Sequence, residues 1–294
     1  MITVIPRGGL ANRMRVMISA QKLSEITGHS VKVKWVKNRD LGCHFKDLFD
    51  LPEGSSGFSV HETIVEPWIY RHYPSESRKT PRPMAWILRY FQRNYINYHI
   101  YYKQCHDFFT PKNIAELKTN HNLHIVLDTS ELVTIPDVHR VDYDYSFLKP
   151  KLNLKSKISS VKELFNEFTI GVHIRRGDFP KRNRSDLAFY MKYMDELIVK
   201  DDRVNFYLCS DESVVKRNLL DKYGNKIITN INSVGRTSTK GVQEALVDLY
   251  SLSSTKKIIG TYNSSFSITA AKWLSDIPLI LIRSENGKDK STTW

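Results

Sequence analysis

The first 36 residues place apolar side chains in the rhythm of a strand, a helix and a second strand. Residues 2–5 form a short run rich in β-branched side chains, which is typical of a buried strand. From Asn12 onward apolar residues recur at helical spacing as far as Gly28, a residue type that commonly ends helices. Residues 31–36 alternate apolar and lysine side chains, which is the period of a half-buried strand. This order predicts an α/β protein with a parallel sheet.

Residues 37–150 show weaker patterns. Thr110 followed by Pro111 predicts a helix start, because threonine caps helices and proline suits the first helical position. Residues 124–128 predict a strand. Residues 81–103 contain an apolar row at helical spacing, made of Met84, Leu88, Phe91 and Tyr95. The row favours an amphipathic helix packed against the core; a helix that contacts an acceptor or a membrane surface is the alternative.

The second half of the chain has a clearer β/α rhythm. Strands are expected at residues 168–174, 204–209, 257–260 and 278–282, and helices from Ser185, from 210 to 220, from 240 to 254 and from 266 to 274. A polar, lysine-rich stretch at 150–160 predicts a linker, and the last dozen residues predict a polar tail. We therefore expect two Rossmann-like domains facing a cleft, over residues 1–150 and 151–294, with ligands at the carboxyl ends of the strands.

The composition narrows the class of protein. The chain has 294 residues, 41% of them hydrophobic, which is enough for two cores. It has no run of about 18 apolar residues and no secretory pattern at its start, so a cytoplasmic protein is expected. Cys43, Cys105 and Cys209 are too widely spaced for a disulfide framework or a zinc site, and we expect reduced, structural thiols. The net charge of +13 favours an anionic partner, such as nucleic acid, anionic lipid or a phosphorylated substrate.

The sharpest chemical feature follows the first predicted strand of the second half. His173, Arg175, Arg176 and Asp178 surround a turn that Gly177 permits. The planar guanidinium group matches the oxygens of a phosphate, and such charged hydrogen bonds are strong in a partly dry cleft. Asp178 is placed to orient an arginine or to cap the turn. A surface turn with Arg–Asp pairs is the alternative interpretation.

Other polar groups also lie near the ends of predicted strands. Ser210 and Asp211 end one strand, where they would contact a base or a ribose, or simply cap the next helix. Ser264 and Ser265 belong to a hydroxyl-rich strand-to-helix loop whose free amides suit a diphosphate. Asp248 lies in the helix that precedes this loop.

A glycine-rich loop precedes the first helix and contains Gly9, Asn12 and Arg13. Glycine lets a ligand approach the backbone closely, although a tight turn alone would also explain it. The loop lacks the Walker signature and the full dinucleotide fingerprint.

These four groups, in this order, resemble the superfamily of fucosyltransferases that make α1,2-, α1,6- and protein O-linkages. Its members have a two-domain GT-B fold and share a Gly-x-x-Asn start, a His-x-Arg-Arg/Gly-x-Asp motif, a strand ending in Ser/Thr-Asp and a late Asp…Ser-Ser segment. The resemblance is greatest to bacterial α1,2 and nodulation-type α1,6 enzymes. It covers residues 1–30 and 168–282, and it is not detectable across about 40–150.

The resemblance implies transfer of L-fucose from GDP-L-fucose, with inversion and without a metal or other cofactor. Arg175 would bind the β-phosphate and neutralise the leaving GDP, supported by Arg176 and His173. Asp211 and Asp248 would help to place the guanosine, Ser264 and Ser265 the phosphates, and Asn12 and Arg13 the donor. The first domain would carry the acceptor side and the second the nucleotide sugar.

The catalytic base is open. Some relatives have an acid in the glycine-rich loop, whereas this chain has Arg7 beside it. Asp178 and Glu212 are candidates for the base, and a loosely assisted displacement without a strong base is the other possibility.

Three other functions compete with this one. Asp142 and Asp144 have the Asp-x-Asp spacing of a metal-dependent transferase, but no apolar strand precedes them. A nucleic-acid-binding protein would use the positive charge, yet basic residues are spread along the whole chain and no recognition module is visible. A GT-B transferase with another nucleotide sugar is the third. For a fucosyltransferase we expect a glycan or lipid-linked oligosaccharide acceptor, no nucleic acid, and a basic surface suited to peripheral contact with the anionic inner membrane face.

Overall fold

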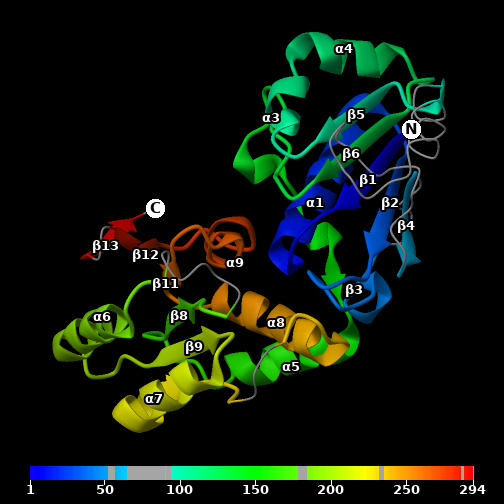
Figure 1. The fold of residues 1–294 in the computed structure, drawn as a ribbon. Coiled ribbons are helices and arrows are strands. Elements are labelled where there is room, and N and C mark those ends of the chain that lie inside the picture. Colours follow the sequence, from blue (N-terminus) through cyan, green and yellow to red (C-terminus); the bar gives the residue numbers. More distant parts are fainter. Residues whose placement is uncertain are drawn as a thin grey trace. The chain divides into compact units, whose positions relative to one another are not determined.

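The computed structural model describes residues 1–51, 57–64, 90, 94–177, 184–231, 235–285 and 288–293. The chain divides into two units, Met1–Lys149 and Pro150–Trp294. Each unit is built on its own sheet, coloured mainly blue to cyan-green in the first unit and green to red in the second (Figure 1). Each sheet buries its own set of apolar side chains, so each unit has its own core.

Within the described residues, the first unit holds a five-stranded sheet in the order β4-β2-β1-β6-β5. Its strands are β1 (Ile2–Pro6), β2 (Val31–Val36), β4 (Phe58–Thr63), β5 (Tyr98–Tyr101) and β6 (Ile125–Thr129). All four pairings between neighbouring strands are parallel. Strand β1 lies between β2 and β6, so the chain changes direction across the sheet at β1. Such a switch point is where ligands of open parallel sheets bind.

Helices α1 (Leu10–Thr27) and α4 (Pro111–Thr119) of the first unit follow the capping signals of the sequence, whereas the short helix α3 (Gln104–Phe108) has no side-chain cap. Helix α1 ends at Gly28, whose φ of 71° is a left-handed conformation that glycine adopts freely. The Thr110 hydroxyl accepts a hydrogen bond from the Asn113 amide at the start of α4. The described residues of the unit also include short 3-10 helices at Phe45–Asp47, Arg140–Asp142 and Tyr145–Phe147. Strand β3 (Phe49–Asp50) pairs with β7 (Lys149–Pro150), which lies at the boundary between the units.

The second unit has a six-stranded sheet across its described residues, in the order β10-β9-β8-β11-β12-β13. The strands are β8 (Ile170–Ile174), β9 (Phe206–Ser210), β10 (Ile227–Ile228), β11 (Ile258–Thr261), β12 (Leu279–Glu285) and β13 (Lys288–Thr293). The first five are parallel, and β13 pairs antiparallel with β12. The helices are α5 (Leu152–Lys162), α6 (Leu187–Lys200), α7 (Ser213–Tyr223), α8 (Thr239–Leu252) and α9 (Ser265–Ile268), with a 3-10 helix at Gly224–Lys226 and a π-helical turn at Thr269–Trp273.

Three local predictions for the second unit are wrong. The expected linker is helix α5, because Leu154 and Ile158 lie one turn apart and bury a narrow apolar stripe among lysines and serines. The expected polar tail contains strand β13. Backbone hydrogen bonds to β12 hold this strand at the sheet edge, where polar residues are tolerated. Helix α6 is capped by Asp186 and not by Ser185, since the Asp186 carboxylate accepts from the Ala188 amide.

The helix predicted over residues 81–103 is wrong at its end, where β5 extends the sheet by pairing with β6. Met84, Leu88 and Phe91 lie outside the described residues. Tyr95, the last member of the predicted apolar row, is exposed.

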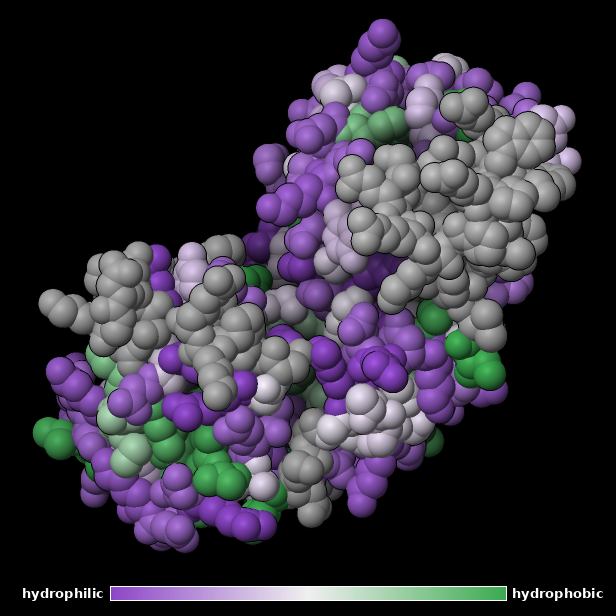
Figure 2. Space-filling model, viewed as in Figure 1, coloured by the Kyte–Doolittle hydropathy of each residue, from purple (hydrophilic) through white to green (hydrophobic). Residues whose placement is uncertain are grey.

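The three cysteines are free, as predicted, and all three are buried. None of the helices in the described ranges is both long enough and apolar enough to cross a bilayer. The face of the molecule drawn in Figure 2 is mainly hydrophilic, with small separate apolar areas.

Candidate active site

The turn after β8 carries Arg175, and the end of β11 fixes its backbone. The Arg175 amide donates to the Thr261 hydroxyl at 2.9 Å. The same hydroxyl donates to the carbonyl oxygen of His173 at 3.1 Å. Tyr190 of helix α6 places its own hydroxyl 3.0 Å from it. Since the proton of Thr261 is already used, the Tyr190 hydroxyl donates this third hydrogen bond, and Thr261 joins two strands and a helix at the start of the turn.

Asp211, at the end of β9, fixes the rest of the turn. Its two carboxylate oxygens accept from the amides of Arg176, at 2.8 Å, and Gly177, at 3.0 Å. A Cβ atom at residue 177 would lie 2.9 Å from the carboxylate, so any larger residue there would force Asp211 to shift. Ser210 does not cap helix α7, whose N-cap residue is Glu212; its hydroxyl accepts from the Glu212 amide and so closes a local turn just before the helix.

The Arg176 side chain is partly fixed by the protein. One terminal nitrogen donates to the carbonyl oxygen of Ser185 at 2.9 Å. Its Nε is buried and has no hydrogen-bond partner among the described residues. Buried donors of this kind are uncommon, because a lost hydrogen bond costs about 1–3 kcal/mol.

His173 is buried in β8 below the turn. Its Nδ1 lies 2.7 Å from the Ser267 hydroxyl, and its ring stacks on Phe266 with centroids 4.8 Å apart. Burial, and then the nearby charge of Arg175, lowers the pKa of His173 to about 3. The ring is therefore neutral near pH 7, and it can offer a hydrogen bond but no positive charge. Gly260 makes room for Ser267, which a Cβ atom there would meet at 2.5 Å.

The loop after β11 brings Ser264 to the same end of the sheet. Asn263 has a φ of 58°, and the Ser264 amide donates to the carbonyl oxygen of Thr261 at 3.2 Å. The Ser264 hydroxyl is fully buried and without a partner in the described part of the chain. Ser265 begins helix α9. Because β9, β8 and β11 are parallel neighbours, Asp211, Arg175 and Ser264 all follow the carboxyl ends of adjacent strands.

Asp248 lies on helix α8, deeper in the same unit. Its carboxylate accepts from the hydroxyl of Tyr207, on β9, at 2.7 Å. Burial raises the pKa of Asp248 to about 6, and the charge of the buried Lys216 counteracts part of this rise. Within the described part of the chain, Asp248 contacts Tyr207 and other buried groups of the unit and makes no hydrogen bond to the turn after β8.

The glycine-rich loop belongs to the first unit. A Cβ atom at Gly8, whose φ is 76°, would lie 2.5 Å from the Asn12 side-chain nitrogen. Arg13 is 1% exposed and donates to the carbonyl oxygens of Gly8 and Val36 at 3.0 and 2.7 Å and to Asn38 Oδ1 at 3.0 Å. Burial lowers the pKa of Arg13 to about 10. Its guanidinium therefore faces inward and supports the loop.

No protein-family model and no curated protein matches the chain. Solved structures do resemble it. A NodZ α1,6-fucosyltransferase soaked with GDP-fucose has a TM-score of 0.64 at 18% identity, with 100% of this chain and 98% of that chain covered. A NodZ fucosyltransferase from Bradyrhizobium has a TM-score of 0.61 at 16% identity, with 99% of this chain and 98% of that chain covered. Arabidopsis thaliana FUT1 in complex with GDP has a TM-score of 0.63 at 16% identity, with 98% of this chain and 71% of that chain covered.

The chain has the fold of the fucosyltransferases. At these low identities the likeness establishes the fold, and the predicted α/β class of GT-B type is confirmed. Within the fucosyltransferase fold, the turn after β8, the end of β9 and the loop after β11 form the candidate site of the second unit.

The sequence analysis also singled out two pairs of acidic residues, the candidate bases and a possible Asp-x-Asp metal motif. Asp178 lies outside the described residues, and Glu212 approaches Arg184 at 3.8 Å. Asp142 and Asp144 accept from the amides of His139 and Ser146, so each caps a 3-10 helix. A search of the described ranges finds no group of three or more His, Cys, Asp or Glu placed to hold a metal ion.

Sequence reasoning missed the anchoring role of Thr261 and Tyr190. Thr261 is the polar last residue of an otherwise apolar strand, the same signal that drew attention to Asp211. Tyr190 has the spacing of a core residue, and only the contact shows that its hydroxyl reaches the turn.

Proposed function

We propose that the chain is a glycosyltransferase that moves L-fucose from GDP-L-fucose to a glycan acceptor, with inversion and without a metal ion. The observation that carries the proposal is the turn of Arg175, Arg176 and Gly177, held by Thr261 and Asp211 at the carboxyl ends of parallel strands. The fold supports it, because neighbours with this fold include proteins solved with GDP or GDP-fucose.

Arg175 provides the main electrostatic contribution. When the bond to the sugar breaks, negative charge grows on the β-phosphate of the leaving GDP. A guanidinium held in place before this step stabilises the charge without first having to reorganise. Arg176 supports the same group, and its buried Nε is a donor that a phosphate oxygen would satisfy after a small rearrangement.

The neighbouring polar groups bind the rest of the donor. His173 is neutral and offers a hydrogen bond to the ribose or the phosphate. The buried hydroxyl of Ser264 has no hydrogen-bond partner among the residues that the structure describes, and together with Ser265 it would bind the diphosphate. Asp211 acts by shaping the turn, because both of its oxygens accept backbone amides, and through that turn it helps to place the guanosine. Asp248, with Tyr207, borders the nucleoside side of the site.

The remaining roles are assigned by resemblance. Asn12 contacts the donor from the first unit, while Arg13 acts through the loop that it supports. The resemblance assigns no base: Asp178 and Glu212 are the candidates to take the proton from the acceptor hydroxyl, and a loosely assisted displacement without a strong base is the alternative. The first unit binds the acceptor and the second the nucleotide sugar.

A nucleotide panel tests this proposal. Thermal unfolding of the full chain is measured with GDP, UDP, ADP and CMP, each with and without EDTA, and GDP-fucose turnover is followed by release of GDP. We expect GDP alone to raise the Tm, equally with EDTA, and Arg175→Ala to lose most of the turnover. A response to UDP that requires manganese would overturn both the donor and the metal-independent mechanism.

We also propose a cytoplasmic location, with peripheral contact between the enzyme and an anionic membrane that carries a lipid-linked acceptor. The net charge of +13 supports such contact. Flotation with vesicles of phosphatidylcholine alone, or with one-third phosphatidylserine, tests it. Salt-sensitive flotation only with the anionic vesicles is expected, and equal recovery with both would contradict the proposal.

A further inference from the structure

Three aromatic side chains form a row along the edge strand β5 and its end in the first unit. The rings of His99 and Tyr101 have centroids 6.4 Å apart, and those of Tyr101 and Tyr102 are 4.5 Å apart, with the rings nearly perpendicular in both pairs. Tyr102, at the end of the row, is 42% exposed. We call these three residues the aromatic row. Its far end lies at the carboxyl edge of the sheet, where ligands of parallel sheets bind.

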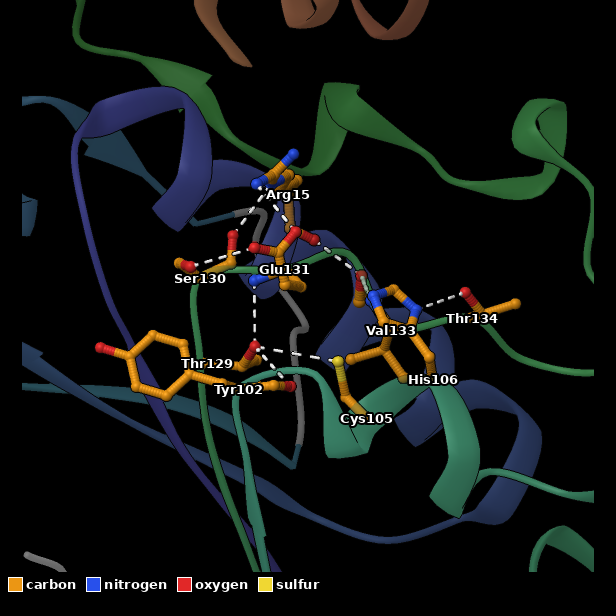
Figure 3. A network of polar contacts seen from close by, with 10 residues as sticks. Arg15, Tyr102, Cys105, His106, Thr129, Ser130, Glu131, Val133 and Thr134 are labelled. Carbon is orange, nitrogen blue, oxygen red and sulfur yellow. Dashed lines mark hydrogen bonds and ion pairs between the residues drawn. The ribbon is translucent and has the colours of Figure 1, made fainter. Parts of the chain in front are cut away.

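Tyr102 adopts a backbone conformation that is rare for a bulky residue. Its φ is 44°, in the left-handed region. Hydrogen bonds hold it there: its amide donates to the carbonyl oxygen of Asp128 at 2.9 Å, and its own carbonyl oxygen accepts from the Thr129 hydroxyl and the Cys105 amide. Figure 3 shows the ring of Tyr102 directed away from this network. Backbone strain of this kind, maintained by surrounding contacts, is characteristic of functional sites.

An ion pair lies beside the row. Arg7 donates two hydrogen bonds, of 2.6 and 2.7 Å, to the buried carboxylate of Asp128. Asp128 is in register with both Tyr101 and Ile5, and Arg7 follows Ile5 by two residues, so the side chains of Arg7, Asp128 and Tyr101 lie on one face of the sheet. Burial, and then the charge of Asp128, raises the pKa of Tyr101. Arg7 keeps part of its side chain, 18%, accessible.

This combination fits the chemistry of a sugar ring. A pyranose has an apolar face of C–H groups and a rim of hydroxyls, so it binds where an aromatic surface adjoins a few fixed polar groups. We propose that the aromatic row and the Arg7–Asp128 pair form a subsite for one pyranose ring of the acceptor glycan. The inference rests on the proposed function, which requires a glycan acceptor, and it assigns the recognition of that acceptor to named residues of the first unit.

Direct binding of simple sugars by the full chain tests the subsite. The probes are methyl β-D-glucopyranoside, methyl β-D-galactopyranoside and methyl N-acetyl-β-D-glucosaminide, observed by saturation-transfer NMR. Tyr101→Ala and Tyr102→Ala should each weaken the best probe by about tenfold, since each removes part of the stacking surface. Tyr95→Ala is the matched control: Tyr95 is also exposed, but its carbonyl oxygen contacts His124, just before the amino end of β6.

Tyr102→Gly separates loss of the ring from loss of the fold. Glycine adopts positive φ freely, so this variant should unfold at the same Tm as the wild type or higher, while it loses sugar binding like Tyr102→Ala. No binding of any probe by the wild type, or wild-type binding by both Tyr102 variants, would overturn the subsite. A wild type that binds a sugar and shows no Tm response to GDP would instead overturn the proposed donor.

Discussion

Gly177 and Asp211 are in such close contact that a Cβ atom on the glycine would lie 2.9 Å from Asp211 Oδ2. The same oxygen accepts the Gly177 amide, and the other accepts the amide of Arg176. Asp211 follows β9, whereas the turn follows β8, so one carboxylate links the ends of two neighbouring strands. The protein itself therefore sets the shape of the arginine-bearing turn before any phosphate binds.

We expect Asp211→Asn to damage both stability and turnover. The amide side chain has only one acceptor oxygen, so one backbone N–H of the turn would face an NH₂ group instead. Loss of one charged hydrogen bond and an unsatisfied donor should lower the free energy of unfolding by about 1–3 kcal/mol. The turnover of GDP-fucose should fall by about tenfold or more. Urea unfolding and release of GDP measure the two effects.

Asp195→Asn is the matched control for this change. Asp195 is half-exposed and pairs with Lys222 at 2.8 Å on the surface of the same unit. Such surface pairs contribute about 1 kcal/mol or less, so stability should change little and turnover should not change. Equal effects of the two substitutions would show that the Asp211 carboxylate does not shape the site.

Arg175→Ala should lower kcat by about tenfold to a few hundredfold, because the variant loses a charged hydrogen bond worth roughly 1.5–3 kcal/mol that strengthens as the leaving group becomes charged. The backbone bond from residue 175 to Thr261 is kept, so the Tm should change little. Arg203→Ala is the control, since Arg203 is exposed and pairs with Asp201. Wild-type kinetics in Arg175→Ala would exclude the residue from the reaction.

Much of the fold could be predicted because its local signals agree. Gly28 ends α1 and Thr110 caps α4, as their residue types favour. The failures share a physical cause. Helix α5 buries only Leu154 and Ile158, too few apolar residues to stand out among lysines, and β13 is held at the sheet edge by backbone bonds, to which sequence composition gives little clue.

The sequence predicts which polar residues of the candidate site follow the strands, but it does not predict which groups their side chains contact. The sequence places Arg175, Asp211 and Ser264 after apolar strands, and parallel pairing brings those ends together. Arg13 shows where this reasoning stops: the resemblance implies a donor-binding residue, yet its guanidinium is buried against Val36 and Asn38 of its own unit. Which partner an arginine finds depends on tertiary packing, which a motif does not encode.

Thr261→Val should loosen the start of the turn. Valine has the same shape but no hydroxyl, so the Arg175 amide and the Tyr190 hydroxyl would lose their buried acceptor, and the carbonyl oxygen of His173 would lose a donor. We expect the free energy of unfolding to fall by about 2–4 kcal/mol, as two or more buried polar groups become unsatisfied, and kcat to fall by about tenfold. Thr261→Ser keeps the hydroxyl and should restore most of both. Wild-type turnover in the valine variant would count against the anchoring role.

Asp248→Asn should stabilise the protein at neutral pH. The pKa of Asp248 is about 6 in the folded chain and near 3.8 when unfolded, so between these values the folded state binds more protons. Stability contributed by the neutral carboxyl is therefore present below about pH 4 and is lost as the pH rises through 6. Asparagine is neutral at every pH and still offers an oxygen to the Tyr207 hydroxyl.

The gain should be roughly 1–3 kcal/mol at pH 7.5 and close to zero at pH 4, measured by urea unfolding at both values. Tyr207→Phe is the counterpart: without its donor the buried carboxylate becomes less favourable, and this variant should lose stability mainly at pH 7.5. If Asp248 borders the nucleoside, the asparagine variant will also bind GDP more weakly while being more stable. A loss of stability at both pH values would instead show that the carboxylate is satisfied by its surroundings when charged.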